Sequence, residues 1–170
     1  KEHGQVMDFL LQLDQSAFGT WVTGSSSLFA FPGILLLHTV GMAAVVGVVA
    51  GIDLKILGFA PALPLKQLAK FLPILWIGLT VNAVTGTMLL IADASTKLIN
   101  PDFGVKMVFI ALAVINLRMI QKKVLGDPDV DKGPLSTNAK VLAATSLFLW
   151  FGAITAGRLL AYVGPVAGLE

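Results

Sequence analysis

Hydrophobic and polar positions divide the chain into four long apolar blocks joined by short polar segments. The blocks cover about residues 29–52, 68–92, 103–120 and 141–163. Each approaches the roughly 20 mostly apolar residues that a helix needs to cross a membrane. None shows the alternation with a period of two that is typical of a strand. The pattern therefore predicts an all-α integral membrane protein, a four-helix bundle that forms one domain over residues 1–170.

The segment before the first block has a different pattern. In MDFLLQLDQSAFGTWV, apolar residues recur at helical spacing among Asp8, Asp14 and Gln15. This is typical of a short amphipathic helix on the membrane surface, with Trp21 at the level of the lipid headgroups. Residues 1–28 are therefore expected to form an interfacial segment. An N-terminal arm packed on the bundle is the alternative.

Composition supports the membrane prediction and excludes several classes of site. Of the residues, 56% are hydrophobic and 13% charged, and the mean hydropathy is +0.85. A soluble domain carries about 25% charged residues. The absence of Cys excludes disulfides, Cys-ligated zinc, iron–sulfur clusters and thiol catalysis. A net charge of +2, with no basic cluster among aromatic residues, argues against binding to nucleic acid.

Lysine and arginine are distributed unequally between the two sides of the membrane. Of the 12, eight lie in or next to the connections that follow the first and third blocks: Lys55, Lys66, Lys70, Arg118, Lys122, Lys123, Lys132 and Lys140. Because cytoplasmic loops carry the excess of basic residues, this side is predicted to be cytoplasmic. Both termini are then expected outside the cytoplasm.

Apart from Lys70 and Arg118, which lie near the basic ends of their blocks, three ionisable residues lie inside the apolar blocks, namely His38, Lys106 and Arg158. Each costs at least ~2.5–3.5 kcal/mol near the centre of a membrane, so each needs a physical reason. All three fall in the outer half of their helices, with His38 ~10 Å below the outer boundary. The two cations have simpler explanations: they extend to the headgroups, or they pair with Asp93 and Asp102. Together, however, they would bring an imidazole and two cations to one leaflet.

Small residues continue along the helix face that carries His38. Gly41 and Met42 lie one turn away, and Gly47 and Gly51 form a GxxxG pair. One interpretation is a close helix–helix contact at these glycines. The other is a groove that holds a flat cofactor coordinated to His38.

The other blocks carry stripes of polar, aromatic and small residues that are expected to face inward. The second block carries Asn82, Thr85, Gly86 and Met88, the third Lys106, Phe109, Ala113 and Asn116, and the fourth Thr145, Phe148, Gly152, Thr155 and Arg158. For any single Thr or Asn, a hydrogen bond between helices is a sufficient explanation.

A haem b site would use this set of residues. Haem needs an axial ligand, small residues beside the ring and cations for its propionates. The expected cofactor-binding residues are His38 as the iron ligand, Gly41, Met42 and Gly86 beside the ring, and Lys106 and Arg158 on the propionates. The second axial ligand stays open between Met42, Met88, Met107, His3 and none. No residue is assigned a catalytic role.

Four segments carry a resemblance to known proteins. They are FAFPGILLLHTVGMAAVVGVVAGIDLKILG, TVNAVTGTMLLIAD, NPDFGVKMVFIALAVINL and FGAITAGRLLAYVG. The chain resembles a family of small uncharacterised bacterial four-helix membrane proteins. It is more distantly similar to the copper-resistance D-type membrane domain and to the haem-binding bacterial protoporphyrinogen oxidase. In those relatives a His lies in the first helix and a Lys opens the third. The resemblance therefore implies roles for His38 and Lys106, and a place in the bacterial inner membrane.

Three functions are compatible with these observations. The first is a haem-b-binding membrane protein that transfers electrons between a quinone or membrane dehydrogenase and an outer partner, alone or as a redox subunit. The second is a non-catalytic accessory subunit of a membrane complex. The third is a small copper-handling or transport protein. An oligomer is compatible with each, and whether the protein is an enzyme stays open.

Overall fold

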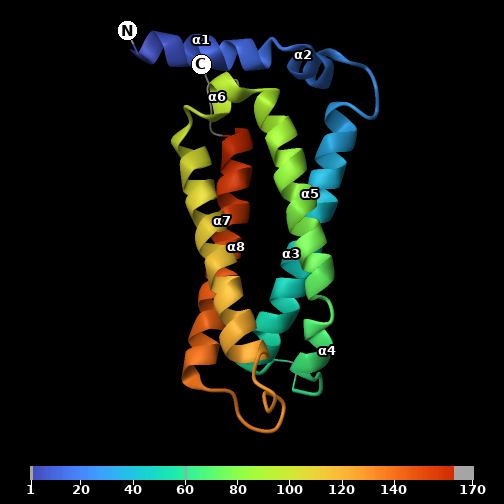
Figure 1. Ribbon diagram of the computed structural model, residues 1–170, viewed down its shortest axis with the longest axis vertical. Helices are drawn as coiled ribbons and strands as arrows, with labels where there is room; N and C mark the ends of the chain where they lie inside the picture. Colours follow the sequence, from blue (N-terminus) through green and yellow to red (C-terminus); the bar gives the residue numbers. More distant parts are fainter. Residues whose placement is uncertain (1, 60, 163–170) are drawn as a thin grey trace.

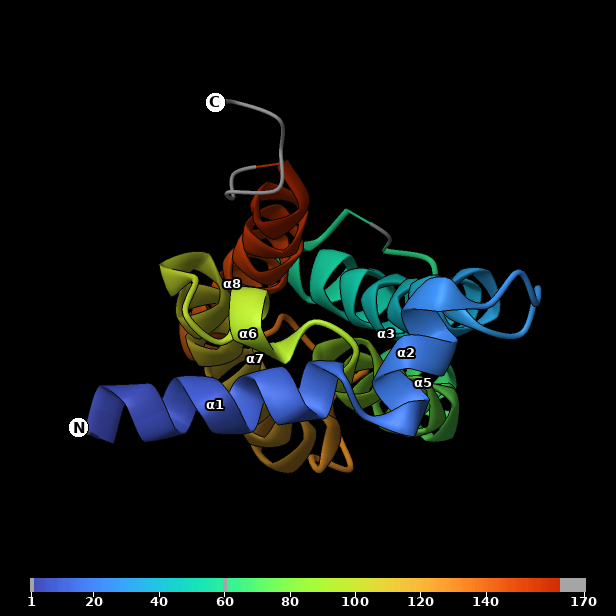
Figure 2. The same ribbon diagram turned by 90° about the horizontal axis from the view of Figure 1, so that it is seen from above.

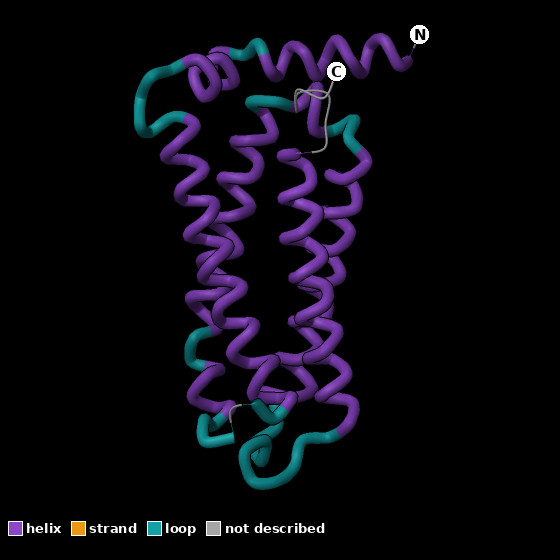
Figure 3. The backbone as a smooth tube through the Cα atoms, turned by 180° about the vertical axis from the view of Figure 1, so that it is seen from behind, coloured by secondary structure: helices purple, strands orange, loops and turns teal. Residues whose placement is uncertain are grey.

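Every regular element of the protein is helical in the part that the computed structural model describes, residues 2–59 and 61–162. Figure 3 shows these helices joined by short loops, with no strand in the described part. The predicted all-α class is therefore confirmed.

Four helices are long and apolar enough to cross a membrane. The candidate spans are Phe31–Leu57, Leu65–Ile91, Pro101–Leu125 and Thr137–Leu160. They correspond to α3 (Phe31–Leu57), α4 (Leu65–Ala69) with α5 (Leu72–Ile91), α7 (Pro101–Ile120) with the π-helical turn η1 (Gln121–Leu125), and α8 (Thr137–Tyr162). The protein is thus a multi-pass membrane protein by length and composition, as predicted.

The predicted block boundaries were wrong at two helix ends. α3 continues five residues beyond Ile52 and includes Asp53, because that side chain is buried in a helix contact and does not mark the start of a polar loop. The helix ends at Gly58, whose left-handed φ of 98° suits glycine alone and whose N–H bonds the Lys55 carbonyl. The third span likewise extends to Leu125 through η1. Residue 163, the predicted end of the fourth block, lies outside the described residues.

The N-terminal segment forms two helices where one was expected. α1 (Glu2–Asp14) and α2 (Ala17–Gly24) are separated at Ser16. The hydroxyl of Ser16 accepts a hydrogen bond from the Gly19 N–H at 3.0 Å, which starts the second helix.

α1 lies across one end of the long helices, as Figures 1 and 2 show. We call this end the α1 end, and the opposite end, with α4 and the loop between η1 and α8, the α4 end. The Asp14 carboxylate accepts hydrogen bonds from the N–H groups of Ala94 and Ser95 and from the Ser95 hydroxyl. These bonds join α1 to the short helix α6 (Ala94–Lys97).

The long helices are arranged as two pairs. α3 packs along α5 and α7 along α8, while α3 also contacts α8. Two hydrophobic clusters connect the pairs: one includes Val49, Leu75 and Leu117, the other Ile56, Ile120 and Ala143. The cluster nearest the α1 end contains Val22, Ile34 and Ala92, from the α2–α3–α5 side. The pairs are therefore joined in the middle and at the α4 end, and they diverge towards the α1 end (Figures 1 and 3).

Glycines bring the backbones of α3 and α5 into close contact. A Cβ atom on Gly78 would lie 2.8 Å from the carbonyl oxygen of Gly41, and one on Gly41 would lie 3.0 Å from that of Gly78. Gly47 and Gly51, by contrast, would meet nothing within 4 Å. The interpretation of Gly47 and Gly51 as a close helix contact is therefore wrong. The contact lies nearer to His38.

Candidate functional site

The His38 side chain is held by a buried threonine of the neighbouring helix. Nδ1 of His38, on α3, lies 2.9 Å from Oγ1 of Thr85, on α5. The Thr85 hydroxyl also donates to the Val81 carbonyl oxygen at 2.6 Å. A hydroxyl has one hydrogen to donate, so Nδ1 of His38 must donate to Thr85. We infer that the neutral ring carries its proton on Nδ1 and a free lone pair on Nε2.

Nε2 of His38 is available to a ligand. It makes no hydrogen bond with any described residue, and it is not among the fully buried polar atoms that lack a partner. The side chain as a whole is half-buried. Gly86 makes room for the ring on the α5 side, since a Cβ atom there would lie 3.3 Å from Cε1 of His38. The imidazole is thus oriented at one nitrogen and open at the other.

The glycines predicted beside the cofactor lie within the α3–α5 contact. Gly41 is buried, and a Cβ atom there would meet Nδ2 of Asn82 at 2.8 Å. The groove beside Gly41 is therefore filled by α5. Gly41 and Gly86 instead allow α5 to approach α3 closely enough for Thr85 to reach His38. Met42 is partly buried on the same helix.

The two predicted propionate ligands differ in burial, since Lys106 is partly buried and Arg158 is exposed. The Lys106 side chain is partly buried along α8, where a Cβ atom on Gly157 would lie 3.6 Å from its Cε. Arg158 is exposed. Asp93, considered as a partner for both cations, pairs instead with Lys97 at 3.4 Å.

The stripe predicted to face inward on the fourth span was wrong. Thr145, Phe148, Thr155 and Arg158 are exposed, and Gly152 is partly buried where the Phe109 ring packs on it. The inward face contains Ala143, Ser146, Leu149, Trp150, Ala153 and Ala156. Alanine and serine let α8 approach α3 and α7 closely, which the bulkier predicted stripe does not allow.

The candidates for a second axial ligand are dispersed. Met88 packs against the cluster of Val22, Ile34 and Ala92. Met107 is 47% exposed. The side chain of His3 lies outside the described residues.

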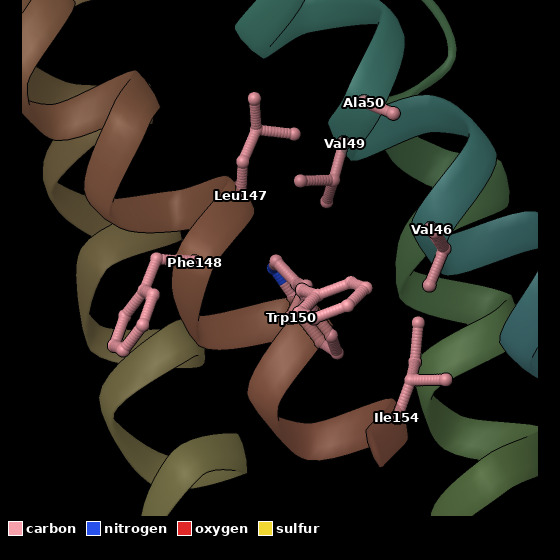
Figure 4. Close-up of a pocket in the computed structure, with 8 residues that line it drawn as sticks. Val46, Val49, Ala50, Leu147, Phe148, Trp150 and Ile154 are labelled. Atoms are coloured by element: carbon pink, nitrogen blue, oxygen red, sulfur yellow. The ribbon is translucent and has the colours of Figure 1, made fainter.

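A pocket of about 410 Å³ lies between α3 and α8, away from His38. Figure 4 shows its lining, which consists of Val46, Val49, Ala50, Leu147, Phe148, Trp150, Phe151 and Ile154. None of the predicted cofactor-binding residues is in it. Val46 lies eight residues from His38, ~12 Å along the helix axis.

Asp53 is a buried ionisable residue that was predicted to lie just outside the first span. It is 1% exposed and lies within α3. One signal in the sequence was available: positions 45, 49 and 53 follow each other at helical spacing, and Val45 and Val49 belong to the core. This spacing predicts that the helix continues past Asp53 and that the Asp53 carboxyl group lies on its core face.

Comparison of the chain with protein-family models, with curated proteins and with solved structures gives no match. In residues 2–59 and 61–162, no group of three or more His, Cys, Asp or Glu side chains lies together as a metal site.

Proposed function

We propose that this chain is a haem-b-binding integral membrane protein in which Nε2 of His38 is an axial ligand of the iron. The observation that carries the proposal is the hydrogen bond from Nδ1 to Thr85, which leaves the lone pair of Nε2 free. Metal-ligating histidines almost always donate their second ring N–H in this way, which fixes the tautomer and the orientation of the ring. Bound haem would supply one-electron transfer.

Lys106 supports the same proposal. A cation that is partly buried in a membrane span costs free energy unless it meets an anion. In the described part of the chain, Lys106 forms no ion pair. Its stem lies along Gly157, which directly precedes Arg158, so both cations occur at the same level of α8. Lys106 is suited to one of the two propionates, whereas the exposed Arg158 would reach the other only by turning its side chain towards Lys106.

The room for a macrocycle would be on the Nε2 side of His38. Gly41 of α3 and Gly86 of α5 lie in the contact between these two helices, so they position the imidazole from the side opposite Nε2. The clusters that join the helix pairs lie nearer the α4 end, and this favours a site between the pairs towards the α1 end. Met42, Met88 and Met107 stay candidates for a second ligand.

We further propose that the chain is a four-helix bundle in the bacterial inner membrane, with the α4 end in the cytoplasm. The positive-inside rule supports this orientation, because Lys55, Lys66 and Lys122 belong to the α4 end. α1 would lie on the outer membrane surface, where its exposed Val6 and Phe9 would meet lipid. A quinone or another subunit of a membrane complex would be the redox partner.

An absorption spectrum of the purified protein, oxidised and then reduced, tests the haem site. The chain contains two histidines, so His3→Ala is a matched control for His38→Ala. We expect a Soret band, with α and β bands that sharpen on reduction, in the wild type and in His3→Ala. His38→Ala should lose them.

A protein that stays colourless after reconstitution with haem, or a His38→Ala variant that keeps the spectrum, would contradict the proposal. His38 and Thr85 would then serve only to join α3 to α5. The accessory-subunit hypothesis would become the favoured one.

A further inference from the structure

A second polar site occurs far from His38, in the contact between α3 and α8. Its central residue, Asp53, lies inside the candidate span Phe31–Leu57 and is 1% exposed. Its neighbours Ile52 and Ile56 belong to the hydrophobic cluster near the α4 end. Asp53 follows His38 by fifteen residues, ~22 Å along the helix axis, so the two sites are separate.

No basic side chain in the described part of the chain compensates the Asp53 carboxyl group. The two ion pairs found there join Lys97 to Asp93 and Lys132 to Asp129. The basic residues of the neighbouring elements have other partners or are exposed. Lys55 donates to the carbonyl of Pro61 and Lys66 to that of Pro128, and the guanidinium carbon of Arg118 lies 4.0 Å from the centre of the Trp76 ring. The remaining ones are exposed, namely Lys70, Lys122, Lys123 and Lys140. An ionised carboxylate buried without a cation in a membrane span is very costly.

Ser146 of α8 lies in the same contact as this carboxyl group. It is 0% exposed, and its α8 neighbours Ala143 and Trp150 pack in the same two hydrophobic clusters as Ile52 and Val49 of α3. Neither Oγ of Ser146 nor Oδ2 of Asp53 makes a hydrogen bond with a described residue. An ionised Asp53 would have no cation and at most one hydroxyl to stabilise its buried charge, whereas a protonated carboxyl group is neutral and can share a hydrogen bond with Oγ of Ser146.

Two other buried polar atoms in the described residues lack a partner, Nε2 of Gln121 and Nε1 of Trp150. Both belong to neutral side chains, so neither supplies a positive charge to Asp53. Trp150 lies one turn from Ser146 on the same face of α8, and its ring projects towards α3 (Figure 4). Of the four groups, Asp53 alone can bind a proton at moderate pH.

We propose that Asp53 and Ser146 form a buried proton-binding site in the α3–α8 contact. The Asp53 carboxylate takes up one proton to become a carboxylic acid, and the new O–H donates to Oγ of Ser146. The bound ligand is a single positive charge, so the membrane span becomes neutral at this point. The site does not depend on haem and is placed at the end of the molecule opposite Lys106.

Infrared spectroscopy of the full chain in membranes at neutral pH tests the proposal. A protonated carboxyl group gives a C=O stretching band that an ionised one lacks. We expect this band in the wild type and its loss in Asp53→Asn, which keeps the size of the side chain. The control is Asp93→Asn, which removes a carboxylate that is paired with Lys97 near the surface and should leave the band unchanged.

Ser146→Ala gives a second readout that does not require the Asp53 variant to fold. Loss of the hydrogen bond should shift the same band to higher frequency. Absence of the band in the wild type, its persistence in Asp53→Asn, or an unshifted band in Ser146→Ala would each overturn the proposal. One of these outcomes can be followed further. If the band is absent, and if Na⁺ but not K⁺ raises the melting temperature of the wild type and not of Asp53→Asn, then the site binds a sodium ion and not a proton.

Discussion

At the scale of single residues, Thr85 decides what His38 can do. Its hydroxyl donates to its own helix and accepts from the imidazole, so it is satisfied in both directions. Thr85 is 4% exposed, and water does not compete with these bonds. An isolated His on an apolar helix would be free to rotate and to exchange tautomers. Thr85 instead presents Nε2 permanently as an acceptor.

Replacing Thr85 tests this positioning role. Thr85→Val keeps the shape of the side chain but removes the acceptor for Nδ1, so the ring loses its fixed tautomer. Loss of such a partner typically lowers metal affinity about 10- to 100-fold. We expect a comparable loss of haem affinity, measured by titration of haem into the apoprotein.

Thr87→Val is the matched control, because Thr87 lies on the same helix, is exposed and donates only to the Ala83 carbonyl. Equal haem affinities of the Thr85 and Thr87 variants would contradict the role of Thr85. An unchanged melting temperature in both variants would separate the effect from general destabilisation.

At the scale of elements, the contact between α3 and α5 positions the site. The carbonyl of Gly41 occupies the place that a Gly78 side chain would need, and Gly86 leaves the corresponding space for the His38 ring. Thr85 lies two turns beyond Gly78 on α5. The close approach at Gly78 therefore determines whether Thr85 can reach the imidazole.

Gly78→Ala should separate the two helices. Its Cβ would lie 2.8 Å from backbone, which cannot yield as a side chain does. Overpacking of this kind costs about 1–3 kcal/mol. We expect a lower melting temperature in detergent, together with weaker haem binding.

Gly47→Ala provides the comparison, because nothing lies within 4 Å of the added atom. This variant should melt at the temperature of the wild type. A Gly78→Ala variant as stable as Gly47→Ala would show that the α3–α5 contact is not as tight as described.

At the scale of the whole molecule, the two helix pairs are closed at one end and diverge at the other. The described N-terminal helices and the last turns of α8 lie at the diverging end (Figure 1). Most basic residues lie at the closed end. Charge and packing thus distinguish the two ends, as a protein with a fixed orientation in the membrane requires.

Cysteine labelling in intact cells tests this orientation, and the chain contains no native Cys to interfere. Ser26 is exposed near the α1 end, and Gly133 is exposed in the loop between η1 and α8. A membrane-impermeant thiol reagent should label Ser26→Cys in intact cells and Gly133→Cys only after lysis. The reverse pattern would place the α4 end outside.

The predictions from sequence were most accurate for the spans and least accurate for helix faces. Four apolar blocks identified four spanning helices, and His38 and Lys106 were correctly singled out as residues within them. The inward face of α8 and the burial of Asp53 were missed. A helix that is apolar on all sides carries little information in its own pattern about which side is inside.

The sequence by itself therefore determined which segments are apolar enough to span a membrane and which residue types are available for chemistry. Both depend on local composition: a run of about 20 apolar residues enters lipid whatever its neighbours are. The tertiary structure alone decided that Gly41 meets Gly78, that Thr85 holds Nδ1 of His38, and that Asp53 and Ser146 are buried in the contact between α3 and α8. These contacts depend on how far each helix is rotated and how closely it approaches its neighbours. The joint packing of all four helices sets both quantities, because lipid is as apolar as the side chains and exerts no preference among faces.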